Sequence, residues 1–162
     1  MEAITRYFTA EKSESILFML TGVLAIILAV FFLIKVKQPF YNGMAYAFIL
    51  IALIQIAVGG SIFMRSPKDI IRVTNILQND KTLIQTEEIP RMKVVMKNFI
   101  LYRWIEIALV LVGIFLFLRS SPETVLKGIG LGLIIQAGIM LMLDYFAEDR
   151  GKKYIEFLST LL

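Results

Sequence analysis

Four apolar runs, each long enough to cross a bilayer, constrain this chain more than any other feature of its sequence. They cover residues 16–34, 44–64, 99–118 and 125–147. The first run has 19 residues, and as a helix it would span about 28 Å, enough for the hydrocarbon core. The runs therefore predict an all-α fold. We expect a four-transmembrane-helix bundle that forms a single membrane domain over residues 1–162.

Composition supports a membrane protein and excludes several kinds of chemistry. Apolar residues make up 58% of the chain and the mean hydropathy is +0.77, too high for a soluble domain of this size. The chain has no His and no Cys, which excludes disulfides, thiol nucleophiles and nearly all zinc, haem and iron–sulfur sites. No nucleophile–base pair and no cofactor motif is present. We therefore predict a protein that is not an enzyme, has no cofactor and binds no nucleic acid.

The distribution of Lys and Arg predicts the orientation in the membrane. Outside the spans, two lie in the N-terminal segment, seven in residues 65–98 and three in the tail 148–162, twelve in all. The two short turns, together with the first residues of the fourth span, hold four. Because Lys and Arg are enriched in cytoplasmic loops, both termini and the central segment are expected in the cytoplasm. The expected location is the bacterial cytoplasmic (inner) membrane.

Turn residues between the spans suggest where helices begin. Asn42, Ser66, Thr86 and Ser121 are each expected as N-caps, and a proline directly after Ser66 and Ser121 fits the first helical position. This predicts a cytoplasmic helical hairpin over residues 66–97, whose second helix continues into the third span. The tail is amphipathic, and it is expected to form a helix that lies along the membrane interface.

Charged residues inside the spans are the first candidates for a functional site, because membrane charges are costly unless they are paired. Arg103 and Glu106 are three residues apart, so they can meet on one helix face, and Asp144 is expected at a similar depth. One hypothesis is an ion pair, or a carboxylate that titrates during transport. The alternative is interfacial, because the neighbouring Trp104 favours the headgroup level, where Arg103 would reach water.

Two glutamines and a pair of glycines complete the candidates within the spans. Gln55 and Gln136 fall near the middle of their helices, and a Gln–Gln or Gln–backbone hydrogen bond between spans is the expected use, worth about 1 kcal/mol. A role in a pore is the alternative. Gly128 and Gly132 form a small-xxx-small motif for close helix packing, either within the bundle or between protomers.

The basic residues Arg91, Lys93 and Lys97 precede the third span. They are expected to contact anionic headgroups or a protein partner.

Two classes of function remain. The first, which the length of segment 66–97 favours, is a non-catalytic membrane protein that acts through protein–protein interaction. Examples are an immunity protein against a membrane-targeting toxin and an accessory protein of a membrane complex, and its partners would be the lipid bilayer and another protein or a second copy. The second is a small oligomeric ion or solute transporter or channel that uses Glu106. Loss of activity in Glu106→Gln would favour the second class.

Overall fold

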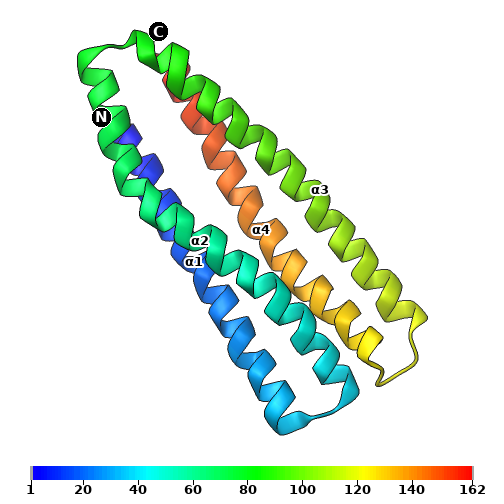
Figure 1. Cartoon of the computed structure of the whole chain (residues 1–162). Coiled ribbons are helices and arrows are strands. Elements are labelled where there is room, and N and C mark those ends of the chain that lie inside the picture. The colour runs from blue at the N-terminus through cyan, green and yellow to red at the C-terminus, as the bar shows by residue number, and fades with distance from the viewer. Residues whose placement is uncertain (1, 162) are drawn as a thin grey trace.

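The computed structural model describes residues 2–161 and consists of four long helices in one bundle (Figure 1). The all-α prediction is confirmed, and all four helices are long and apolar enough to cross a membrane. The elements are α1 (Glu2–Phe31) with its π-helical extension η1 (Phe32–Val36), α2 (Pro39–Asn79), the π-helical turn η2 (Ile84–Glu88), α3 (Ile89–Arg119) and α4 (Val125–Ser159). Each predicted span lies within one of these helices.

The two ends of the bundle differ. One end, here called the loop end, carries the short connections at residues 37–38 and 120–124 (Figure 1). The other, here called the terminal end, carries both termini and the connection between α2 and α3 (Figure 1). Along the bundle, α1 packs on α2, α2 packs on α4, and α4 packs on α3. The termini and segment 66–97 therefore lie at one end, as predicted.

The helices are longer than a bilayer core is thick. The 41 residues of α2 span about 60 Å, against about 30 Å of hydrocarbon. The parts beyond the predicted spans come together at the terminal end, where all four helices share one hydrophobic core. Its buried members are Ile4, Tyr7, Phe8, Val73, Ile76, Ile84, Ile89, Met92, Tyr154 and Leu158.

Segment 66–97 forms a helical hairpin, but its first helix does not begin at Ser66. Helix α2 runs without a break through Pro67. Packing against α1 outweighs the lost backbone hydrogen bond, because Arg65 binds Glu11 of α1 at 3.1 Å and also binds Asp69 at 3.1 Å, across the proline.

The other expected N-caps were also wrong. Helix α2 begins at Pro39, whose fixed φ suits the first helical position, so Asn42 lies inside the helix. Thr86 lies inside η2. Helix α4 is capped by Thr124, which accepts a hydrogen bond from the Lys127 backbone at 3.4 Å, rather than by Ser121. Local sequence signals therefore placed helix starts about three residues from their true positions.

The tail is helical, but it does not form a separate helix on the membrane interface. It continues α4, and its apolar side covers α1 at the terminal end. The rings of Tyr154 and Tyr7 stack with centroids 4.0 Å apart, and Leu158 is fully buried. A protein surface, rather than lipid, therefore receives the apolar side of the tail.

This packing predicts a difference in chemical accessibility that is easy to measure, because the chain has no cysteine of its own. Leu158→Cys should react with a water-soluble maleimide at least about tenfold more slowly than Glu156→Cys, since Leu158 is buried and Glu156 is exposed. The difference should persist in detergent, where no bilayer covers the tail. Equal rates in detergent would contradict the packed tail.

Candidate functional site

Three polar side chains lie inside the membrane-spanning part of the bundle. Gln55 of α2, Glu106 of α3 and Gln136 of α4 are all 2% exposed or less. Among the described residues, no donor or acceptor pairs with Oε1 of Gln55, either carboxyl oxygen of Glu106 or Nε2 of Gln136. An unpaired polar atom in an apolar interior costs about 1–3 kcal/mol. Such atoms therefore mark the part of the bundle where a function is to be sought.

Glu106 lies beside Asp144 of the neighbouring helix α4, close enough for the two carboxyl groups to interact. Two carboxylates cannot hydrogen-bond to each other, so a bond between them requires a proton on one of the two. Asp144 also lies within range of the charges of Glu14 and Glu148. The expected association of Asp144 with Glu106 is therefore present, as a pair of acids.

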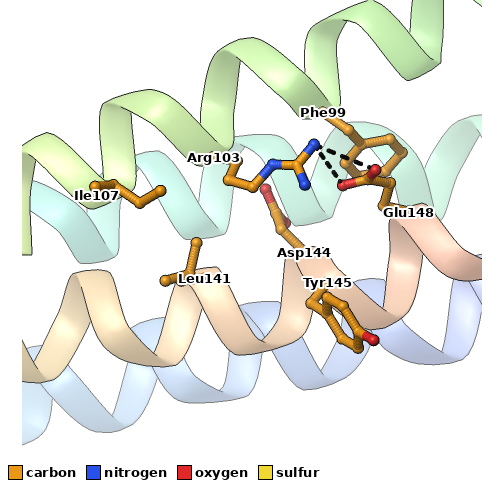
Figure 2. Close-up of a pocket in the computed structure, with 7 residues that line it drawn as sticks. All are labelled: Phe99, Arg103, Ile107, Leu141, Asp144, Tyr145 and Glu148. Carbon is orange, nitrogen blue, oxygen red and sulfur yellow. Dashed lines mark hydrogen bonds and ion pairs between the residues drawn. The ribbon is translucent and has the colours of Figure 1, made fainter.

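Arg103 does not pair with Glu106. Its guanidinium Nη2 lies 3.2 Å from the Glu148 carboxylate on α4 (Figure 2). The predicted Arg103–Glu106 ion pair is therefore wrong: Glu148 is a neighbour that spacing within one helix cannot reveal. Arg103 keeps 40% of its side chain exposed, so it still reaches the surface of the bundle.

The charges around the acid pair do not cancel. Four carboxyl groups gather here with three basic groups, namely Glu14, Glu106, Asp144 and Glu148 with Arg103, Arg150 and Lys152. Arg150 pairs with Glu14, while Arg103 and Lys152 both bind Glu148. With every group ionised, the cluster carries one excess negative charge. One proton or one monovalent cation would neutralise it.

Gln55 and Gln136 are both buried, but Gln55 does not bond to Gln136. The Nε2 of Gln55 donates to Oγ1 of Thr21 on α1, at 3.5 Å. This bond joins α2 to α1 through a threonine hydroxyl, and not through the second glutamine or a backbone group as expected.

The glycine motif packs within the bundle. A Cβ on Gly128 would lie 1.8 Å from the backbone oxygen of Phe40, and one on Gly132 would lie 2.8 Å from Cβ of Ala47. Gly43 of α2 faces α4 in the same way. Here Gly128 and Gly132 bring the backbones of α2 and α4 into contact.

Arg91 is part of an internal ion-pair network at the terminal end. Glu88 is fully buried, and it is bound by Arg91 at 2.7 Å, by Arg72 at 2.6 Å and by the hydroxyl of Tyr154 at 3.3 Å. Burial opposes ionisation of Glu88. The hydrogen bonds and charges of Arg91 and Arg72 outweigh it and hold the pKa of this carboxyl below its usual value. Lys93 and Lys97, in contrast, are exposed.

Glu88 was not among the site residues predicted from the sequence. One signal could have revealed it: Ile84, Glu88 and Met92 recur every four residues, which places Glu88 on an apolar helix face. No comparable pattern marks Glu148 or Glu14, because Arg103, which binds Glu148, and Arg150, which binds Glu14, lie on other helices.

The fold and the spans define a small integral membrane protein with four helices. No protein-family model, curated protein or solved structure matches the chain. Within residues 2–161, no group of three or more acidic side chains is arranged to hold a metal ion.

Proposed function

We propose that the protein carries a proton or another monovalent cation across the membrane, with Glu106 and Asp144 as its ion-binding pair. The observation that carries this proposal is Glu106 itself, 1% exposed inside the membrane-spanning part of the bundle and facing a second acid. Ionisable residues within spans are costly to bury, and in transporters they commonly mark the path of ions or protons. In this proposal the protein performs no covalent chemistry.

Two further features support transport. The charge cluster carries one excess negative charge, which matches a singly charged ion. The unpartnered atoms of Gln55 and Gln136, and Oδ1 of Asn42 nearer the loop end, are further buried polar groups within the bundle. In the proposed transport, buried polar groups of this kind would interact with water or an ion inside the bundle.

The segment that favoured an interaction protein supports that function less than expected. Residues of 66–97 cover the ends of α1 and α4 and form the shared core, so packing accounts for the length of the segment. Arg91 is occupied by Glu88. The orientation with both termini in the cytoplasm, in a bacterial inner membrane, stays a proposal supported by the distribution of Lys and Arg.

An interaction function is still favoured by one observation, the free face of α3. This helix packs chiefly on α4, and Leu101, Trp104 and Phe115 are 55%, 65% and 62% exposed. A membrane protein partner or a second copy could pack there. This second function predicts that Glu106→Gln behaves like the wild type.

Flux measured in proteoliposomes tests the transport proposal. The wild type should dissipate an imposed pH gradient, or a monovalent cation gradient, faster than protein-free vesicles. Glu106→Gln should reduce this flux to the background, because an amide can neither hold a proton nor neutralise a cation. Asp149→Asn is the matched control, since Asp149 is 51% exposed and pairs only on the surface with Lys153. Wild-type flux in Glu106→Gln would refute the proposal.

A further inference from the structure

A groove between α3 and α4 lies directly beside the acid pair. Its cavity measures about 230 Å³. Figure 2 shows that Phe99, Arg103 and Ile107 of α3 line one side, and that Leu141, Asp144 and Tyr145 of α4 line the other. Tyr145 is 66% exposed, so the groove opens at the surface of the bundle rather than into its centre.

We infer that this groove binds an organic monocation, an amine or quaternary ammonium on an apolar body, with the charged end at Asp144. The inference deepens the proposed transport function and rests on it.

The lining of the groove favours such a ligand. Two aromatic rings and two aliphatic side chains form its walls, which suits an apolar body, and aromatic faces attract ammonium groups. The charge at its base is negative. Glu148 is already bound by Arg103 and Lys152, whereas no basic side chain pairs with Asp144 among the described ion pairs.

Other ligand classes fit less well. A divalent metal ion takes about six or more oxygen ligands, and no group of three or more acids among the described residues is arranged to hold one. An anion would meet Asp144 and Glu148, and the one basic group in the groove, Arg103, is held by Glu148 at 3.2 Å.

Because the charge cluster has one excess negative charge, we expect the organic cation and a proton to compete for it. The charged groups near the acid pair are Glu14 of α1, Arg103 of α3, and Glu148, Arg150 and Lys152 of α4. Helix α2 adds none, because it has no titratable residue between Tyr46 and Arg65. One excess negative charge can be neutralised by a cation in the groove or by a proton on Glu106 or Asp144. A cation that enters should therefore displace a proton.

Binding of benzyltrimethylammonium to the full chain in nanodiscs tests this inference. The probe carries a permanent single charge and an apolar ring, and calorimetry in buffers of different ionisation enthalpy reports both its affinity and any released protons. We expect proton release on binding, weaker affinity at lower pH, and at least about a tenfold loss of affinity in Asp144→Asn, equivalent to about 1.4 kcal/mol. Asp144→Glu should restore part of the affinity, and the unfolding temperature of each variant shows whether it is folded.

Two controls separate the groove from general hydrophobicity. Tyr102→Ala removes an exposed aromatic ring of α3 that does not line the groove, and it should leave binding unchanged, whereas Tyr145→Ala should weaken it. Neopentylbenzene has the shape of the probe without its charge and should not bind. Equal binding of both compounds, or binding without proton release, would overturn the inference.

The flux and binding experiments can refute the transport proposal and the organic-cation inference independently. Flux that depends on Glu106 in a protein that does not bind the probe would leave the transport proposal intact and refute the organic cation. Binding of the probe at Asp144 without any flux would establish the groove as a binding site and refute transport.

Discussion

Gly128→Ala should abolish the packing of α2 against α4 and prevent recovery of a stable folded protein. The added Cβ would lie 1.8 Å from the backbone oxygen of Phe40, and backbone atoms cannot move aside as a flexible side chain can. The two helices would have to separate, at a cost of about 3 kcal/mol or more. Thermal unfolding in detergent, followed by size-exclusion chromatography, measures the loss.

Gly138→Ala on the same helix is the matched control. A Cβ at Gly138 would meet nothing within 4 Å, so the substitution should stabilise the helix by up to about 1 kcal/mol. If both variants unfold alike, close packing of α2 and α4 at Gly128 is not what holds the loop end together.

Glu88→Gln should destabilise the terminal end by about 3 kcal/mol, because it leaves two arginines without their buried counter-charge. The value lies at the lower end for a broken ion pair because the side chains of Arg72 and Arg91 are 36% and 25% exposed. Glu87→Gln is the control: Glu87 is exposed, and its change should stay within about 0.5 kcal/mol. Chemical denaturation of the purified variants gives both values.

The same residue makes stability depend on pH in a defined direction. The pKa of Glu88 is lower in the folded protein than in the unfolded chain, where a glutamate titrates near pH 4.3. Its contribution is therefore complete above about pH 4.3 and is lost as the pH falls through the lower folded-state value. The difference in stability between the wild type and Glu88→Gln should shrink over this acidic range. A difference that grows on acidification would contradict the ionised state of Glu88.

The positions of the membrane spans could be predicted, because they depend on which residues avoid water. The four apolar runs cannot avoid the bilayer, and an even number of spans places both termini at one end. Asp144 was expected near the depth of Arg103, from which it could join Arg103 and Glu106, and it lies beside Glu106.

What could not be predicted depends on register between helices. Arg103 has an acid three residues away on its own helix, yet it binds Glu148, because contacts between α3 and α4 set which residues face each other. The Ser66–Pro67 sequence is typical of a helix start, but Glu11 and Asp69 hold Arg65 so that the helix continues. In both cases a contact between distant segments outweighed a local preference.

The way α3 is held has a mechanical consequence. Near the loop end its Gly113 lies against the backbone of Gly130, and at the terminal end Met96 packs on Gly151. Between these two points α3 contains neither Pro nor Gly, the residues at which helices usually bend. Helix α3 is therefore expected to move as one stiff element, with Glu106 between these two contacts. To expose the acid pair, α3 would have to bend or separate from α4 along this stretch, because it has no hinge residue there.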